Sequence, residues 1–187
     1  AFYGCTSLTS ITIPDNVTSI GSSAFSSCKG LTSITIPNSV TTIGEDAFSG
    51  CSSLTSVTIP EGVVTIGSNA FYVCEGLIEV NLPNSLNSIS NYAFYGCNNI
   101  REVTLATATS IATYAFYACT QLSKVDFEDG CKLEIVGNYA FSDCISIVEI
   151  QLPNAVSSIG NCAFSGCISI EKFNGITDGE MLLPKNI

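Results

Sequence analysis

The sequence predicts a solenoid, a stack of similar coils in which each coil packs against its neighbours along the stack. Three observations predict it. An Ala-Phe pair recurs at steps of 23, 23, 23, 23, 22, 25 and 23 residues, a cysteine follows each Phe by three residues, and the apolar positions between pairs repeat as well. The pairs are Ala1-Phe2, Ala24-Phe25, Ala47-Phe48, Ala70-Phe71, Ala93-Phe94, Ala115-Phe116, Ala140-Phe141 and Ala163-Phe164.

The first part of each unit predicts two short extended stretches. In the unit that ends at Cys51, Ile34-Thr35-Ile36 alternates apolar and polar residues, which is typical of a half-buried strand. Pro37 ends that strand because proline cannot donate a hydrogen bond to a neighbouring strand. Val40 and Ile43 then indicate a second, shorter extended stretch.

The second part of each unit predicts a turn. Gly44 is expected to adopt unusual backbone angles, and the Ala-Phe-x-x-Cys segment is expected to form one helical or 3₁₀ turn with Ala, Phe and Cys inside. The residue after the glycine is of a type that caps helices, with Glu45 the exception. These residues are Ser22, Ser68, Asn91, Thr113, Asn138 and Asn161.

The repeats predict a single domain over residues 1–187. One unit alone cannot offset the backbone entropy of folding, roughly 1–2 kcal/mol per residue, so the coils must bury each other's faces. We divide the chain into a partial repeat at 1–5, seven full repeats at 6–167 and a degenerate repeat at 168–187. Because it opens in the tail of a unit, we expect a fragment or a processed form. The irregular units 98–119 and 120–144 are expected to differ in the loops after their strands.

The repeated unit L-x-x-I-x-I-P-x-x-V-x-x-I-G-x-x-A-F-x-x-C resembles the leucine-rich repeats of the BspA-like, or Treponema pallidum-type, family. The match covers about residues 1–173, and it departs in the two irregular units and in the tail. The resemblance implies a leucine-rich-repeat solenoid, curved and right-handed, with a parallel sheet on its concave face. It also implies a surface or secreted protein of a host-associated organism, with adhesion to host proteins or other cells. The family offers no catalytic motif to carry over.

Composition argues against several classes of function. The net charge of -10 disfavours nucleic acid and anionic membranes as partners, and no apolar run is long enough to span a membrane. Histidine is absent, and no phosphate-binding or dinucleotide motif is present. We therefore expect no enzyme activity and no cofactor. Asp126, Glu128 and Asp129 could be read as a calcium or magnesium site, but a solvated loop at the two-residue insertion is the favoured interpretation.

Eight of the ten cysteines occupy one repeated position, which predicts a ladder of buried, reduced thiols. Parallel side chains in a ladder do not point at each other, so disulfide geometry is poor. Cys131 and Cys162 lie off the ladder, and Cys162 is expected to be partly exposed.

The outward strand positions are the candidate binding surface. The first three coils carry only Ser and Thr there, whereas later coils carry charged and amide side chains. The candidate ligand-binding residues are Glu79, Asn81, Glu102, Thr104, Lys124, Asp126, Glu149, Gln151 and Lys172. Tyrosines crowd the Ala-Phe turns and form a second candidate surface. They are Tyr72, Tyr92, Tyr95, Tyr114, Tyr117 and Tyr139.

These features favour a non-catalytic interaction module that is extracellular or at the cell surface, the location resting on the resemblance. Its expected partner is a host or neighbouring-cell protein or glycan, and unpaired end coils also predict end-to-end self-association. The alternative is a structural spacer within a larger surface protein. Ice or crystal binding by the Thr ladder ranks last because only three coils carry it.

Overall fold

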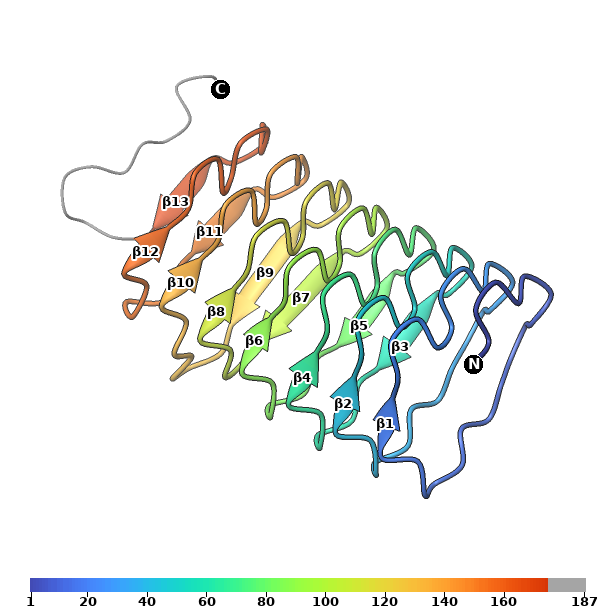
Figure 1. Ribbon diagram of the computed structural model, residues 1–187. Helices are drawn as coiled ribbons and strands as arrows, with labels where there is room; N and C mark the ends of the chain where they lie inside the picture. The colour runs from blue at the N-terminus through green and yellow to red at the C-terminus, as the bar shows by residue number, and fades with distance from the viewer. Residues whose placement is uncertain (175–187) are drawn as a thin grey trace.

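The computed structural model describes residues 1–174 and shows a β-solenoid in which each coil contributes up to two parallel strands (Figure 1). This confirms the predicted fold class. The longer strands are β3 (Ser56–Thr58), β5 (Glu79–Asn81), β7 (Glu102–Leu105), β9 (Lys124–Phe127), β11 (Glu149–Gln151) and β13 (Lys172–Asn174). The two-residue strands are β1 (Ser19–Ile20), β2 (Thr42–Ile43), β4 (Thr65–Ile66), β6 (Ser88–Ile89), β8 (Ser110–Ile111), β10 (Ile135–Val136) and β12 (Ser158–Ile159).

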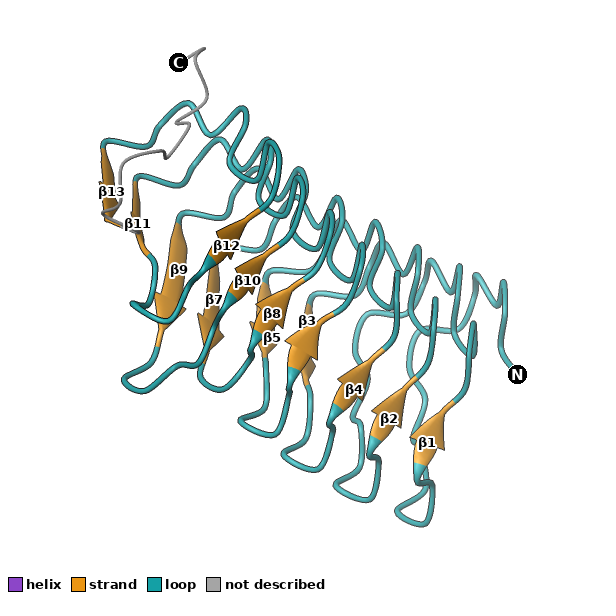
Figure 2. Ribbon diagram, turned by 60° about the vertical axis from the view of Figure 1, so that its left-hand side comes forward, coloured by secondary structure: helices purple, strands orange, loops and turns teal. Residues whose placement is uncertain are grey.

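The two strand sets form two faces of the stack (Figures 1 and 2). The longer strands pair in the orders β3-β5-β7-β9 and β11-β13, and we call their outer surface the long-strand face. The two-residue strands pair as β1-β2-β4 and β6-β8-β10-β12. Residues pair with their equivalents one repeat later, as Val57 does with Val80 and Ile43 with Ile66. The repeat period of the sequence therefore sets the register of strand pairing.

The core is built from the repeated apolar positions. Within a coil, the repeated Leu, Val, Ala, Phe and Cys positions are buried, for example Leu77, Val80, Ala93, Phe94 and Cys97. The phenylalanines stack along the axis with centroids 5.3–5.4 Å apart and nearly parallel planes, from Phe2 to Phe164. Each coil thus supplies the apolar surface that its neighbours need.

The Ala-Phe segment differs from its prediction, because the described residues 1–174 contain no helix. Tight turns replace it: the Ala47 N–H donates to the Gly44 carbonyl at 3.3 Å within the coil. The next amide donates outside the coil, from Phe48 to the Ala70 carbonyl at 2.8 Å. Alternate amides thus serve the turn and the neighbouring coil, so a helix would leave the coils unlinked here.

The unusual backbone angles also lie elsewhere than predicted. Gly44 is not in the left-handed region; a Cβ there would lie 2.7 Å from the Ser22 backbone nitrogen, so the glycine permits close approach between coils. The left-handed residues precede Ala-Phe and precede Cys, as Asp46 (φ 54°) and Gly50 (φ 71°) do. Two of the predicted helix caps link coils instead: Asn138 Oδ1 accepts the Asn161 N–H at 2.7 Å, and Asn91 Oδ1 accepts the Thr113 N–H at 3.1 Å.

The two irregular units leave the stack intact, as predicted. β9 pairs with β7 over four residues, and β10 pairs with both β8 and β12. The extra residues of unit 120–144 lie in the loop between β9 and β10, where Gly130 adopts φ +86°. The degenerate repeat at 168–187 contributes β13, which pairs with β11, while residues 175–187 lie outside the described residues.

Candidate functional site

The strands place every predicted binding residue on the long-strand face or at its edge. In β3, β5 and β7 the outward side chains are exposed while the central valine is buried. A parallel sheet built at one-repeat register aligns equivalent outward residues of successive coils, such as Glu79 with Glu102. The alternation of the sequence therefore decides which side chains reach solvent.

A depression of about 630 Å³ lies on this face over β5 and β7. It is lined by four of the predicted residues, which are Glu79, Asn81, Glu102 and Thr104. It also contains Glu61, Asn84 and Arg101, which the sequence reasoning missed, and Glu128, which that reasoning considered only for a metal site. Lys124 and Asp126 contact Glu102 or each other from β9, and Glu149, Gln151 and Lys172 lie farther along on β11 and β13.

The missed residues belong to the segments that flank the strands. Glu61 follows Pro60 in the turn after β3, and its Oε2 accepts the Asn84 N–H of the next coil at 2.9 Å. Arg101 precedes β7 by one residue. Strand alternation says nothing about such residues, although their charge against a Ser- and Thr-rich background was a usable signal.

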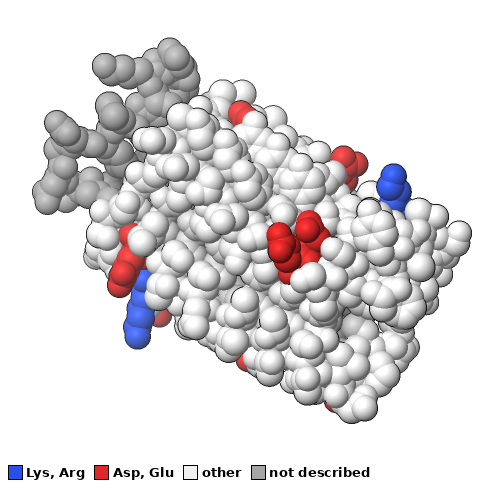
Figure 3. Space-filling model, viewed as in Figure 1, with Lys and Arg blue, Asp and Glu red and all other residues white. Residues whose placement is uncertain are grey.

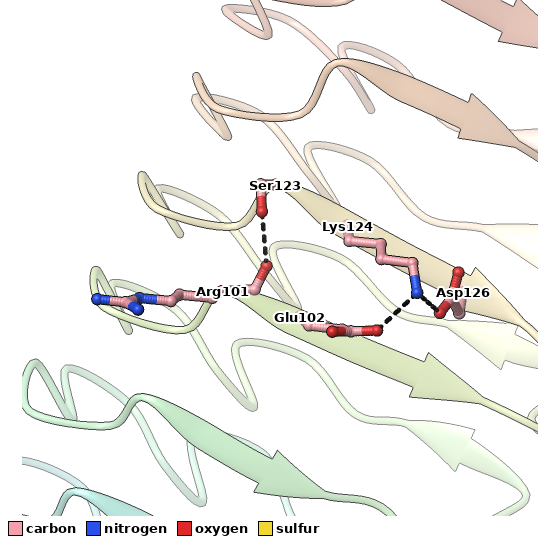
Figure 4. Close-up of polar contacts among 5 residues, drawn as sticks. All are labelled: Arg101, Glu102, Ser123, Lys124 and Asp126. Carbon is pink, nitrogen blue, oxygen red and sulfur yellow. Dashed lines mark hydrogen bonds and ion pairs between the residues drawn. The ribbon is translucent and has the colours of Figure 1, made fainter.

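An ion-pair network joins β7 and β9 (Figure 4). Lys124 Nζ lies 2.8 Å from Glu102 Oε1 and also contacts the Asp126 carboxylate. The Asp126 and Glu102 carboxylates raise the pKa of Lys124, so the amine stays charged. All three side chains are about half exposed, so this network adds little to stability and instead fixes where charges sit.

The depression is acidic overall. Glu61, Glu79, Glu102 and Glu128 surround it, and Arg101 is the cationic residue of the lining. Glu79 and Glu102 are direct cross-strand partners, an arrangement that costs stability between like charges. Lys124 offsets part of that repulsion through Glu102. The surface therefore suits ligands that bring cationic groups or hydrogen-bond donors.

The N-terminal part of the same face is different in kind. A second depression of about 430 Å³ is lined by uncharged residues, including Ser33, Thr35, Ser56 and Thr58. Among residues 1–174, no cluster of three or more His, Cys, Asp or Glu is arranged to hold a metal ion. The described part of the chain also has no helix long and apolar enough to cross a bilayer.

The cysteine ladder links neighbouring coils. The sequence predicted that its thiols are buried, but it did not predict the hydrogen bonds that they donate. Seven of its eight members are buried, from Cys28 to Cys167, whereas Cys5 at the end of the stack is exposed. Each buried thiol donates to the phenylalanine carbonyl of the preceding coil, as Cys97 Sγ does to Phe71 O at 3.0 Å. Burial raises the pKa of Cys97 to about 12, so the thiol stays protonated and unreactive.

The two off-ladder cysteines differ from each other. Cys131 is a buried residue of the loop between β9 and β10, with its Sγ 3.9 Å from the Ala108 carbonyl. Cys162 is exposed, as expected, and raises the pKa of the nearby Tyr139 hydroxyl. No cysteine among the described residues forms a disulfide.

Comparison with known families and structures agrees with this architecture. The family described as "BspA type Leucine rich repeat region" matches in six copies, over residues 1–123 and 109–178. No functionally curated protein matches the chain.

Several solved structures share the fold. A leucine-rich repeat protein from Bacteroides ovatus is 32% identical with a TM-score of 0.72, over 94% of this chain and 53% of its own. One from Eubacterium ventriosum is 30% identical with a TM-score of 0.77, over 95% of this chain and 46% of its own. A leucine-rich cell surface protein from Faecalibacterium prausnitzii is 25% identical with a TM-score of 0.53, over 96% of this chain and 62% of its own. The chain spans about half the length of the first two.

Proposed function

Because the chain belongs to the BspA-type leucine-rich repeat family, we propose that it is a non-catalytic interaction module. It binds a protein or glycan of a host or neighbouring cell through the long-strand face. The observation that carries the proposal is the charged row on β5, β7 and β9, anchored by the contacts of Lys124 with Glu102 and Asp126. Charge at these positions departs from the Ser and Thr that the first coils carry.

The shape of the face supports this role. Side chains from successive coils line up at the strand spacing, so a partner can contact many coils at once. The acidic depression over β5 and β7 supplies a centre for such a contact. The described residues offer Ser, Thr, Asn and carboxylate groups but no histidine base, which suits recognition better than catalysis.

The relatives support a location outside the cell or on its surface. One solved relative is itself described as a leucine-rich cell surface protein, and it matches 96% of this chain. A module there meets proteins and glycans of other cells directly, which is why we place its partner among them.

The test replaces the charged row by the residue of the N-terminal coils. The fluorescently labelled protein is applied to a glycan array and to an array of purified extracellular matrix proteins. The variant Glu79→Ser, Glu102→Ser, Lys124→Ser is compared with Ser10→Ala, Ser33→Ala on the uncharged coils. We expect the wild type and the control to bind the same spots, and the triple variant to lose at least about tenfold in affinity.

Two results would overturn the proposal. Full retention of binding by the triple variant would show that the ligand sits elsewhere. Absence of wild-type binding to either array and to intact epithelial cells would favour the spacer role instead. The long-strand face would then be an ordinary polar surface.

A further inference from the structure

Six tyrosines form one patch of ring contacts. They belong to the loops that connect each two-residue strand to the next longer strand, and Figure 2 shows these loops as one row. Tyr72, Tyr95 and Tyr117 stack with centroids 4.9 Å and 4.8 Å apart. The second row stacks at 5.0 Å and 4.8 Å; its members are Tyr92, Tyr114 and Tyr139. Tilted contacts of 5.4–6.3 Å join the rows. We call these six residues the tyrosine patch.

The second row occupies a backbone position that disfavours tyrosine. Tyr92, Tyr114 and Tyr139 have φ of 57°, 59° and 55°, in the left-handed region. The equivalent position holds Ser23, Asp46, Asn69 and Cys162 in the other coils, and Asp and Asn tolerate that region far better than a bulky ring. Such strain, of order 1 kcal/mol or more per residue, concentrates at functional sites. In three consecutive coils a tyrosine occupies this position despite the strain.

The patch presents ring edges and hydroxyls rather than ring faces. Stacking within each row covers the faces, while every one of the six side chains stays partly exposed. One end is acidic: Asp143 lies close to the Tyr117 hydroxyl and raises the pKa of that tyrosine to about 12. The Tyr117 hydroxyl therefore remains protonated at neutral pH. Lys and Arg are sparse on this molecule, and the side seen in Figure 3 is mostly uncharged.

The size of the patch argues against a second copy of the chain as its occupant. Aromatic side chains carry about 150–250 Å² each, and these six are no more than about one third exposed, so the patch offers at most roughly 500 Å². A stable dimer buries about 800 Å² on each partner. Two chains that each carry a charge of -10 also repel each other. A narrow double row of donors suits a short linear segment instead.

We propose that the tyrosine patch binds a proline-rich segment of a partner protein, in the polyproline II conformation, with a basic residue placed at Asp143. Two steps along a row, 4.9 Å and 4.8 Å, come close to one polyproline II turn of roughly 9.3 Å. That conformation leaves its carbonyls unpaired, so they accept hydrogen bonds from the tyrosine hydroxyls. The prolines pack against the exposed ring edges, and Asp143 supplies the charge complement.

The test uses isothermal titration of the whole chain with synthetic peptides. One peptide has about nine prolines and a terminal arginine, a second ends in glutamine, and a third replaces the prolines by Gly and Ser. We expect the first to bind with a Kd below about 1 mM and at least roughly tenfold tighter than the Gly/Ser peptide. In Asp143→Asn, the preference for arginine over glutamine should disappear.

The key variant is Tyr95→Ser, Tyr114→Asn, Tyr117→Ser, which installs residues that other coils carry at those positions. It removes one left-handed tyrosine, so we expect an unchanged circular dichroism spectrum together with loss of peptide binding. The triple Ser variant of the long-strand face serves as the control and should bind the peptide normally. Equal affinity for the proline and Gly/Ser peptides would overturn the proposal. A tyrosine-dependent dimer in sedimentation would overturn it as well.

Discussion

Phe94→Ala tests whether the stacked phenylalanines hold neighbouring coils together. Phe94 is fully buried and its ring lies 5.3 Å from both Phe71 and Phe116. Truncating a buried phenylalanine typically costs about 3–5 kcal/mol, and aromatic pairs add roughly 0.5–1.5 kcal/mol each beyond their buried area. Because the truncation cost already includes the lost pairs, and two of them are lost here, we expect the upper part of that first range, about 4–5 kcal/mol.

The matched control is Phe2→Ala at the end of the stack. Phe2 is 37% exposed and stacks on Phe25 alone, so its removal should cost about 1–2 kcal/mol. Urea unfolding followed by circular dichroism measures both. Because repeats couple only to their neighbours, the Phe94 variant should also broaden the transition as the two halves separate. Equal costs for the two variants would refute the reasoning that each coil is its neighbour's core.

Three other predictions follow from the thiols and the glycines. At pH 8, Ellman's reagent should react quickly with two of the ten cysteines, the exposed Cys5 and Cys162, and with the rest only on unfolding; fast reaction of more than two would contradict the buried ladder. Burial raises the pKa of Cys51, Cys97 and Cys167 to about 12, so the folded state keeps protons that the unfolded state releases above pH 9. The contribution of each of these thiols to the free energy of unfolding should be complete below pH 9 and should fall by roughly 1.4 kcal/mol per pH unit up to pH 12. Urea midpoints measured across this pH range test this, and a flat profile would argue against buried thiols. Gly130→Ala should cost about 1 kcal/mol, because Gly130 has φ +86°, whereas Gly21→Ala, with equally open space but no left-handed φ, should cost no stability in thermal melts. A loss at Gly21 as large as that at Gly130 would contradict this.

Some properties of the candidate site follow from sequence period and others from the coil geometry. Alternation along each strand correctly placed Glu79, Glu102 and Lys124 outward, because side chains of a strand point to opposite faces. It gave no information about Glu61, Arg101 and Glu128, which reach the depression from turns and strand ends. The binding role of all these residues stays a prediction.

The turn segment shows where local reasoning fails. The residues of Ala-Phe-x-x-Cys are typical of a helical turn, and the Ser or Asn before this segment is a residue type that often caps helices. In the structure, alternate amides of this segment donate to carbonyls of the next coil instead, as the Phe48 N–H does to the Ala70 carbonyl. A bond between residues 22 apart is invisible to any local pattern, so propensity gives way to the stack.

By itself, the sequence determined the architecture of this protein. A period of 23 residues with fixed apolar places forces equivalent residues to stack, and that alone decided the parallel register, the phenylalanine core and the burial of most ladder thiols. Only the tertiary structure decided how the side chains that depart from the repeat are arranged relative to one another. The acidic depression, the contacts of Lys124 and the double row of tyrosines join side chains from different coils. Their distances depend on how far one coil rises and shifts above the last, which backbone hydrogen bonds between coils set and no single repeat encodes.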